Sequence, residues 1–395
     1  MPEPSPDFAV VGAGIFGAAT ALELAARGAS VTLLDPGPLP HPDAASTDIS
    51  KLVRGDYGTD AFYTDLADAA LPLWRAWNAR LGAELFHETG LAILSTTPLE
   101  AGGFEGDSFR TLLARGARPE RLDAGAIAAR LPGFRPGVYV DGYVSAGGWV
   151  ESGRVVAGLL AECARAGVRV VAGARVRPIP PGTGRLGGVD LEGGDRVLAG
   201  EVVVCAGAFT PVLVPELADR MTPVGQPVLH FASEAPELGP PAMLPWAADI
   251  ARNGWYGFPR HEGVVKVANH GRGVVVDPAA PRVVPEGALA AFRAFFAESI
   301  PRLVDAPHVR SRLCLYCDSF DGDFLIDRHP ERPDLTIAAG GSGHAFKFAP
   351  LLGRFAAARA TRDPAEPAPW HASWRARFAW RERSGDRLEA ARAPT

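Results

Sequence analysis

A glycine motif near the N-terminus, Gly12-Ala13-Gly14-Ile15-Phe16-Gly17, constrains the fold of this chain more than any other feature. The apolar run 8–11 precedes it, a stretch of helical character follows to about residue 27, and a second apolar run leads to Asp35. A GxGxxG motif in this strand–turn–helix–strand context is typical of a dinucleotide-binding site. The sequence therefore predicts that the chain begins with a Rossmann-like α/β unit.

Each glycine of the motif has a separate role in such a site. Gly12 permits the tight turn, Gly14 lets a pyrophosphate approach the backbone, and Gly17 lets the helix pack closely on the strand. Free N–H groups at the start of the helix then face the phosphates. Asp35 can accept hydrogen bonds from a ribose diol, and its charge disfavours the 2′-phosphate of NADP. The alternative, a glycine-rich turn without a ligand, explains the agreement of all the spacings less well.

Composition narrows the class of protein. A chain of 395 residues exceeds the usual size of one core, so we expect two domains. The formal net charge of −5 provides no general attraction for nucleic acid or an anionic membrane, and no apolar run reaches transmembrane length. Four cysteines and the absence of a signal peptide favour a reducing, cytoplasmic location.

The texture of the sequence changes along the chain and predicts a discontinuous domain. Segments 1–85, 150–215 and 322–370 read as alternating helices and apolar strands, which predicts an α/β nucleotide-binding domain. Segments 86–149 and 216–321 are richer in proline, glycine and aromatic residues, which predicts a second, α+β domain with an antiparallel sheet over the ligand. The clearest elements of the second domain are strands at 91–94, 255–258 and 264–268 and a helix at 286–298.

The C-terminal tail, residues 371–395, is rich in arginine. We expect it to be helical, with Trp374, Phe378 and Trp380 docked on the body of the protein. Because charge runs usually form a solvated face, the arginines are expected to face solvent rather than to bind a polyanion.

Residues 314–347 combine a CxxC pair, Cys314 and Cys317, with an apolar strand at 335–339 and the glycine-rich turn 340–343. A strand that opens into such a turn lets a ligand lie against bare backbone. No second cysteine or histidine pair completes a zinc site, and the βαβ context of a redox dithiol is missing. The residues alone still leave zinc, a dithiol, two buried thiols and a nucleophile for a cofactor as alternatives.

Several stretches together resemble the sarcosine oxidase family of amine-oxidising flavoproteins, whose relatives include N-methyl amino acid, pipecolate, saccharopine and fructosyl amino acid oxidases. The resemblance covers nearly the whole chain. It is carried by the turn 12–17 with Asp35, by Asp48-Ile49-Ser50-Lys51-Leu52-Val53-Arg54-Gly55-Asp56-Tyr57, by 255–259 leading to Lys266 and His270, and by 312–316 through 324–327 to 343–348. It implies an FAD-binding domain of the glutathione reductase-2 or DAO type beside a substrate domain.

The resemblance also implies roles for single residues. FAD would be tethered through its 8α-methyl group to Cys314, and Arg54 and Lys347 would bind the carboxylate of the substrate. Lys266 would lie near flavin N5 and stabilise negative charge on oxygen as it is reduced.

The rest of the expected site also follows from the resemblance. His270, His344 and Tyr256 would line the substrate cavity. The expected cofactor contacts are Gly12, Gly14, Ile15, Phe16, Gly17, Asp35, Ser46, Lys51, Val176, Ala206, Gly207, Cys314, Gly341, Gly343, His344 and Lys347. No metal is expected, because the histidines lack the spacing of metal ligands.

Two residues depart from the pattern of the family. Lys51 stands where sarcosine-oxidising members have arginine, and this version is closer to members that act on bulkier or cyclic substrates. Cys317 is unusual, and the sequence offers no role for it.

Simpler interpretations compete with the functional ones. Lys266 lies in an apolar run and can extend to solvent from a sheet edge, and Arg54 can pair with Asp56. The two histidines can be structural, and Trp255, Tyr256 and Tyr316 can be core aromatic residues.

The predicted function is FAD-dependent oxidation of a secondary amine or amino acid that carries a carboxylate, with oxygen as acceptor and an imine and hydrogen peroxide as products. The expected partners are a small-molecule substrate and oxygen, with no nucleic acid or membrane, in a monomer or weak homo-oligomer. A flavin dehydrogenase, a tailoring enzyme of secondary metabolism and a catalytically idle assembly subunit are the alternatives.

Overall fold

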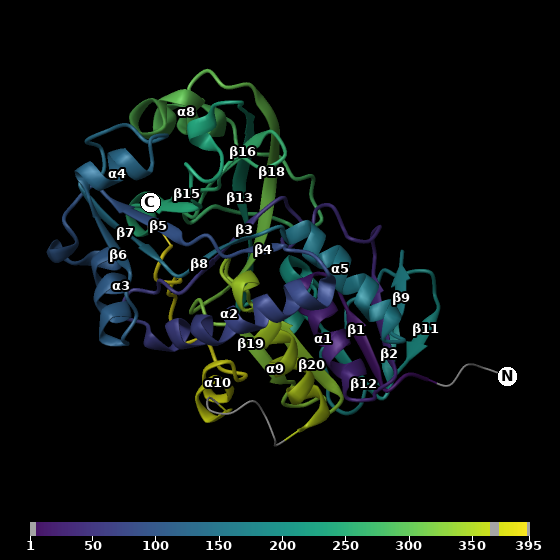
Figure 1. Ribbon diagram of the computed structural model, residues 1–395. Helices are drawn as coiled ribbons and strands as arrows, with labels where there is room; N and C mark the ends of the chain where they lie inside the picture. The colour runs from purple at the N-terminus through teal and green to yellow at the C-terminus, as the bar shows by residue number, and fades with distance from the viewer. Residues whose placement is uncertain (1–4, 364–370, 393–395) are drawn as a thin grey trace.

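Two large sheets organise the protein in the computed structural model, which describes residues 5–363 and 371–392 (Figure 1). The first sheet has six strands, in the order β19 (Leu325–Arg328), β20 (Leu335–Ala339), β12 (Glu201–Val204), β1 (Phe8–Val11), β2 (Val31–Asp35) and β9 (Arg169–Ala172). Its neighbouring strands are parallel except β19 and β20. The central strands are buried along their whole length, which explains why they read as continuous apolar runs.

Helices cover this sheet. Helix α1 (Ile15–Ala26) packs against α5 (Ser152–Arg165) and α9 (Ala349–Thr361) beside the strands (Figure 1). The arrangement confirms the predicted α/β unit, since the turn of residues 12–14 joins β1 to α1 as expected.

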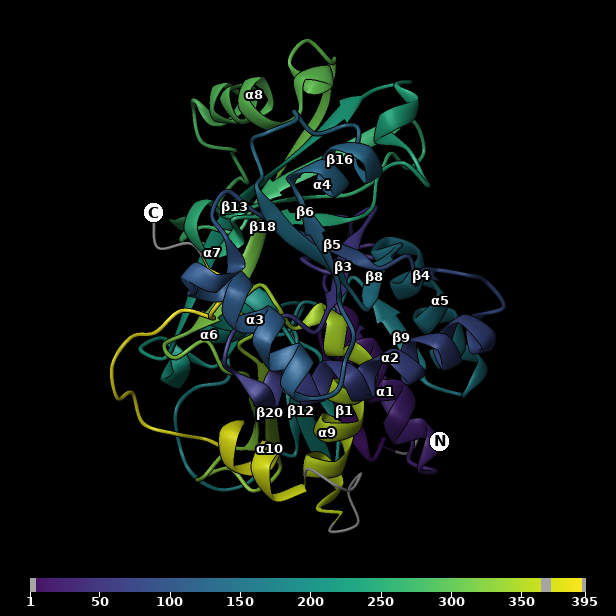
Figure 2. The same cartoon turned by 60° about the vertical axis from the view of Figure 1, so that its left-hand side comes forward.

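The second sheet is mixed rather than purely antiparallel. It runs in the order β17 (Val274–Val275), β13 (Met221–Ala232), β16 (Val264–Asn269), β15 (Trp255–Gly257), β14 (Trp246–Ala248), β5 (Leu91–Ser95), β7 (Asp141–Ser145) and β6 (Glu120–Asp123), with β18 (His308–Ser319) paired to β13. The pair β14–β5 is parallel and the other pairs are antiparallel. Figure 2 shows this sheet above the first one. The helices of this part of the chain are α3 (Gly103–Ala114), α4 (Ala124–Arg130), α7 (Ile250–Asn253) and α8 (Ala288–Ser299).

The long strands β13 and β18 join the two layers (Figure 1). Phe231, near one end of β13, lies in the core of the second sheet, whereas Met221 at the other end lies with Cys317 in the core beneath the first sheet. Side chains along this strand pair are therefore held between the two sheets, where a site can form.

A third, small sheet was not predicted from the sequence. It contains β3 (Lys51–Arg54), β8 (Gly147–Val150) and β4 (Phe86–His87). Helix α2 (Ala61–Leu81) begins after Asp60, whose side chain accepts a hydrogen bond from the N–H of Tyr63, and ends at Gly82. Two further strands, β10 (Gly188–Asp190) and β11 (Arg196–Leu198), form a hairpin, and the short helix α6 (Thr210–Leu213) follows β12.

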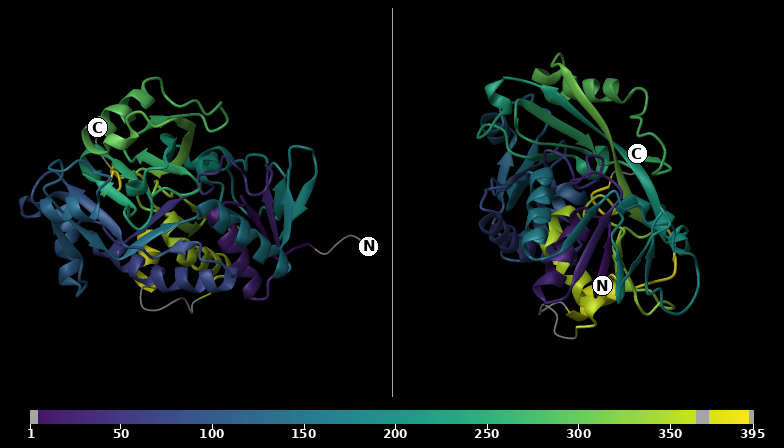
Figure 3. Two further views of the ribbon diagram at one scale, coloured as in Figure 1. Left: turned by 45° about the horizontal axis from the view of Figure 1, so that its top comes forward. Right: turned by 90° about the vertical axis from the view of Figure 1, so that its right-hand side faces the viewer.

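The tail differs from the prediction. Helix α10 (His371–Arg377) ends early, and residues 379–389 have no regular secondary structure. Trp374 and Phe378 are buried as expected, packed on Phe355. The yellow segment then runs from α10 towards the second sheet, away from the N-terminus (Figures 2 and 3).

The tail arginines do not form a solvated helix face. Several pair with carboxylates of the body, in the ion pairs Arg377–Asp60, Arg377–Asp323, Arg381–Asp321, Arg387–Asp323 and Arg392–Asp318. These pairs hold an irregular segment on the surface that helix propensity alone would not fix.

Candidate active site between the two sheets

The glycines of the N-terminal motif are required by close backbone packing. Gly12 has a φ of +100°, and a Cβ there would lie 2.5 Å from the carbonyl oxygen of Cys205. A Cβ at Gly17 would overlap the carbonyl oxygen of Gly12. The motif therefore brings the start of α1 against the ends of β1 and β12, as a nucleotide-binding turn requires.

Asp35 closes the same turn from the end of β2. Its Oδ2 accepts a hydrogen bond of 2.8 Å from the N–H of Ala13, and its Oδ1 accepts one of 3.0 Å from Gly37. Ser46 lies over the helix start, where its Oγ accepts from the N–H of Ile15 at 3.3 Å. The carboxylate and the hydroxyl thus meet at the positive end of α1, where phosphates bind.

Other predicted cofactor residues follow neighbouring strands at the same edge of the sheet. Ala206 and Gly207 follow β12, and Gly207 has a φ of +54° with open space on its Cβ side. The turn 340–343 follows β20, and a Cβ on Gly341 would lie 3.7 Å from the ring of Phe16. Val176 lies just after β9 and is buried. The carboxyl ends of β1, β2, β9, β12 and β20 therefore meet at one edge, as ligand binding in this fold requires.

Some buried polar atoms without partners lie in or against the loop 46–50, whose Ser46 contacts the start of α1. Among the described residues, Thr47 Oγ1, Ser50 Oγ and His230 Nδ1 are buried and have no hydrogen-bond partner. Such atoms are rare unless a ligand or water satisfies them. A flavin ring, which has hydrogen-bonding atoms along one edge, fits this requirement, and the glycine turns fit its pyrophosphate and ribose.

Lys266 lies in the middle of the second sheet, on β16 between β13 and β15. Its side chain is 1% exposed, so the simpler interpretation, extension to solvent from a sheet edge, is wrong. Its Nζ lies 2.8 Å from Asp48 Oδ2 and over the ring of Phe258, while His230 bonds the other oxygen of Asp48 at 3.3 Å. Burial lowers the pKa of Lys266 to about 8, and Asp48 opposes that shift.

The pKa of Asp48 is shifted by the same ion pair. Burial alone would raise the pKa of its carboxyl, but Lys266 and His230 lower it well below the usual value, and Lys51 and Arg312 act in the same direction. The motif 48–54 therefore supplies a buried carboxylate that fixes a buried cation, a role that the sequence analysis did not assign to it.

Cys314 and Cys317 point to opposite faces of β18. Cys314 packs with Tyr316, Val228 and Ala268, next to the loop of Ser46, and its Sγ lies 4.0 Å from the carbonyl oxygen of Ala45. Cys317 packs in the core of the first sheet, with its Sγ 3.7 Å from the Sδ of Met221. Because neighbouring strand positions alternate in direction, the pair cannot bind one metal ion or act as a dithiol. Cys317 is a core residue.

Arg54 lies at the end of β3 with its guanidinium buried. The alternative pair with the Asp56 side chain is not formed, since Arg54 donates to the backbone carbonyl of Asp56. Its ion-pair partner is Glu389, at 3.3 Å from Nη2, and the second oxygen of Glu389 is 3.1 Å from His270 Nε2. Tyr57 lies beneath the guanidinium, at 4.8 Å from the ring centroid. Arg54 and His270 thus share one carboxylate.

Lys347 is a buried cation without a carboxylate partner among the described residues. Its Nζ donates to Tyr57 Oη at 3.0 Å and to the His344 carbonyl at 2.7 Å. Burial lowers its pKa well below the usual value, and the charge of Arg54 lowers it further. A desolvated ammonium beside a guanidinium is stabilised by an anion, so the pair forms an anion site.

His344 fixes the orientation of the Tyr57 hydroxyl, which contacts Lys347. Its Nε2 is 3.0 Å from the carbonyl oxygen of Gly322, so Nε2 carries the proton, and Nδ1 accepts from Tyr57 Oη at 3.0 Å. Burial lowers the pKa of His344 to about 3, which keeps the ring neutral. Tyr57 therefore presents its oxygen lone pairs to Lys347. The structure brings Tyr57 into the site, although the sequence analysis quoted it only as part of a motif.

Two further predicted site residues, Tyr256 and Lys51, lie beside these groups. Tyr256, on β15, packs on the Cys314 cluster with its ring 6.4 Å from that of His270. Lys51, at the start of β3, is half-buried and contributes positive charge at Asp48 and Lys266.

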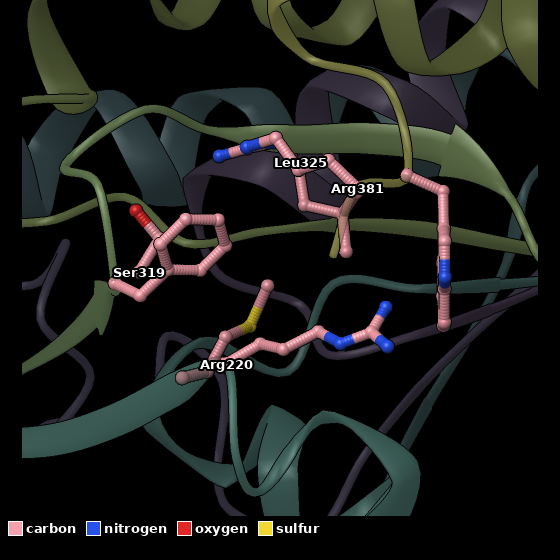
Figure 4. Close-up of a pocket in the computed structure, with 7 residues that line it drawn as sticks. Arg220, Ser319, Leu325 and Arg381 are labelled. Carbon is pink, nitrogen blue, oxygen red and sulfur yellow. The ribbon is translucent and has the colours of Figure 1, made fainter. Parts of the chain in front are cut away.

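Two cavities lie near these residues, a cleft and a smaller space. A cleft of about 500 Å³ reaches Tyr57 and is bordered by Asp60, Arg377 and two tail residues, Arg387 and Ala390. A smaller cavity, of about 10 Å³, lies between the ends of β13, β18 and β19 and the tail, and Figure 4 shows the side chains that line it. The lining of that cavity includes none of the predicted site residues.

Two classes of site are not found in the part of the chain that the structure describes. It contains no group of three or more histidine, cysteine or carboxylate side chains that could hold a metal ion. None of its helices has the length and apolar character needed to cross a membrane.

A nucleotide-binding sheet edge that faces a second sheet carrying buried cations defines a two-domain flavoprotein oxidoreductase. The chain belongs to the family described as "FAD dependent oxidoreductase", whose model matches residues 7–359.

Curated relatives match the chain over most of its length. A monomeric sarcosine oxidase of Streptomyces avermitilis is 30% identical over 368 residues, covering 90% of this chain and 93% of its own. An N-methyl-L-tryptophan oxidase of Salmonella arizonae is 28% identical over 359 residues, covering 89% of this chain and 93% of its own.

Solved structures share the fold. Amadoriase I of Aspergillus fumigatus, a fructosyl amine:oxygen oxidoreductase, has a TM-score of 0.76 at 26% identity, covering 97% of this chain and 93% of its own. A thermally stable mutant of fructosyl peptide oxidase has a TM-score of 0.86 at 22% identity, covering 99% of this chain and 97% of its own. At that identity the second likeness shows the fold alone.

Proposed function

We propose that the protein is an FAD-dependent oxidase of a secondary amine or amino acid that carries a carboxylate. The observation that carries this proposal is the buried pair of cations, Arg54 and Lys347, at the edge of the nucleotide-binding fold. Bound FAD would accept a hydride equivalent from the carbon next to the amine nitrogen and pass the electrons to oxygen, giving hydrogen peroxide.

Arg54 and Lys347 would position the substrate by its carboxylate. A buried guanidinium forms bidentate bonds with a carboxylate, and the ammonium of Lys347 adds a donor without a competing carboxylate of its own. Tyr57 holds both cations, one over its ring and one at its hydroxyl. The carboxylate would therefore be fixed in place, which sets the position of the amine carbon.

Lys266 would supply the positive charge that oxygen needs as it is reduced. Its ammonium is fixed by Asp48, so no reorganisation is required when negative charge develops. A charge placed in advance at a dry site is more effective than one that solvent must provide.

Cys314 is the proposed covalent anchor. The other three cysteines lie in packed cores, where burial raises the pKa of Cys163, Cys205 and Cys317 to about 12 and disfavours the thiolate. Cys314 lies on the face of the second sheet that carries Lys266, with its Sγ 4.0 Å from the carbonyl oxygen of Ala45, next to Ser46, which contacts the start of the nucleotide-binding helix.

The named relatives indicate the substrate class. They are oxidases of sarcosine, N-methyl-L-tryptophan and fructosyl amines, all of which contain a secondary amine. We extend that class to this chain, with Lys51 favouring substrates larger than sarcosine. We also propose a cytoplasmic protein that is a monomer or weak homo-oligomer. Its nucleotide domain would be formed by 1–85, 150–215 and 322–370 and its substrate domain by 86–149 and 216–321.

Peroxide release with a panel of N-methyl, cyclic and sugar-linked amino acids tests the proposal. Peroxide with one class of substrate, and none with the matching amine that lacks the carboxylate, is the expected result. Bleaching of the flavin by substrate without peroxide would identify a dehydrogenase instead. No bleaching with any member of the panel would favour an idle subunit.

A further inference from the structure

The C-terminal tail places a carboxylate of the protein at the proposed substrate anion site. Glu389 is 2% exposed, and its two oxygens contact Arg54 Nη2 at 3.3 Å and His270 Nε2 at 3.1 Å. Its charge also acts on Lys347 and His344. Arg54, one of the two residues expected to bind a substrate carboxylate, thus already pairs with a carboxylate of the protein.

Neighbouring residues of the tail hold Glu389 in this position. On its C-terminal side, Arg392 forms a two-pronged ion pair with Asp318, at 2.9 Å and 2.8 Å, and donates to the carbonyl oxygen of Gly271. Ala391 is fully buried in a core cluster. Gly322 packs so closely on the tail that a Cβ there would lie 2.9 Å from the N–H nitrogen of Glu389.

The segment before this contact is exposed and irregular, and side chains tie it to the body. Residues 382–387 are exposed, Glu382 pairs with Arg220, and Arg387 pairs with Asp323, whereas the pair Arg383–Asp386 is local to the tail. The tail residues Arg387 and Ala390 also border the cleft that reaches Tyr57, the residue that contacts both Arg54 and Lys347. Glu389, Ala391 and Arg392 are thus buried beyond an exposed, irregular segment, in the form of a strap.

We propose that residues 388–392 act as an autoinhibitory strap whose Glu389 carboxylate occupies the substrate carboxylate site and is displaced when a carboxylate substrate binds. The inference rests on the proposed function, since it deepens the description of the same anion site. Two carboxylates cannot share Arg54 at short range without repulsion, so the tail and the substrate compete.

Competition has a measurable consequence. If the strap is bound about 90% of the time, it weakens the apparent affinity for a carboxylate about 10-fold, because only the open fraction binds. Substrates with further contacts in the cleft overcome this more easily than small carboxylates, so the strap would also select against small ligands.

The first test uses the holoenzyme and benzoate, a carboxylate without an amine, with the visible spectrum of the flavin as the signal of binding. Glu389→Gln keeps the shape of the side chain and removes its charge, so benzoate is expected to bind about 10-fold more tightly than to the wild type. Asp386→Asn is the matched control, because Asp386 is an exposed tail carboxylate paired only within the tail. Its affinity for benzoate is expected to equal that of the wild type.

A second measurement needs no variant. Hydrogen exchange of the backbone at 388–392 is expected to accelerate when benzoate saturates the wild-type holoenzyme, because the strap detaches. Unchanged or slower exchange would overturn the proposal, as would unchanged, weaker or undetectable benzoate binding by Glu389→Gln. Both readouts are independent of amine oxidation. A failure of the proposed oxidase activity, with both benzoate results as expected, would therefore leave the strap intact.

Discussion

The ammonium of Lys266 lies 2.8 Å from the carboxylate of Asp48, and both side chains are almost fully buried. The pair fixes a positive charge next to the loop that precedes β3, on the side of the second sheet that carries Cys314 and Tyr316. Burial makes this charge costly, since it lowers the pKa of Lys266 to about 8. A cation retained at such a cost indicates a function for its charge, and two predictions follow from it.

Replacing Lys266 by Met should slow the reaction of the reduced enzyme with oxygen by about 100-fold, the usual effect of removing one preorganised electrostatic group. Stopped-flow mixing of substrate-reduced enzyme with oxygenated buffer measures this step. Anaerobic reduction of the flavin by substrate serves as the control and should change much less. Equal slowing of both steps would show that Lys266 has a structural role instead.

The pKa of Lys266 predicts a pH dependence with a definite sign. Its charged form is present below about 8 and is lost as the pH rises through that value. Reoxidation by oxygen should therefore slow above about pH 8. Reduction by substrate should become faster with pH, because the substrate amine must be neutral to react. Rapid-reaction measurements of the two steps separate these trends, and a reoxidation profile in Lys266→Met that matches the wild type would contradict the assignment.

Removing one cation from the anion site should weaken binding of carboxylate substrates. Arg54→Gln is expected to raise KM about 100-fold, because truncation of a buried charge pair costs about 3 kcal/mol. The methyl ester of the same substrate is the control, and its kcat/KM should fall far less. A similar loss for acid and ester would mean that Arg54 supports the fold and not the carboxylate.

The two cysteines of the CxxC pair should behave differently. Cys314→Ala is expected to release all flavin into the supernatant when the protein is precipitated with acid, whereas wild-type protein gives a yellow pellet. Cys317→Ala should keep the flavin in the pellet and only destabilise the protein by about 1 kcal/mol, through the small cavity that it leaves. A colourless wild-type pellet would disprove the covalent bond.

A substitution at Gly343 tests the importance of the glycine turn after β20. Its φ is +77°, and a Cβ there would lie 2.3 Å from the ring of Tyr316. Gly343→Ala should therefore destabilise the protein by about 2–4 kcal/mol and reduce the bound FAD, as strain and overpacking combine. Gly194→Ala is the matched control, since Gly194 has a φ of +95° but open space around it. Urea unfolding and flavin absorbance report the two effects, and equal losses for both variants would rule out the packing argument.

Much of the architecture could be predicted because its signals are local. The turn of Gly12 and Asp35 sits between a strand and a helix that follow one another in the chain, so spacing alone defined it. The small sheet of β3, β4 and β8 gave no such signal, because its strands are short and come from distant segments. The tail helix ended earlier than predicted because ion pairs such as Arg381–Asp321 hold the chain in an irregular path.

By itself, the sequence determined the nucleotide-binding unit and the residues available for chemistry, because glycine spacing, apolar runs and the resemblance are properties of neighbouring positions. Only the tertiary structure decided how the charges are paired. It placed Cys314 and Cys317 on opposite faces of one strand, enclosed Lys266 with Asp48, and joined Arg54 to Glu389 across 335 positions of the chain. Such pairs depend on the path of the whole backbone, since a buried charge takes whichever partner the fold brings within reach.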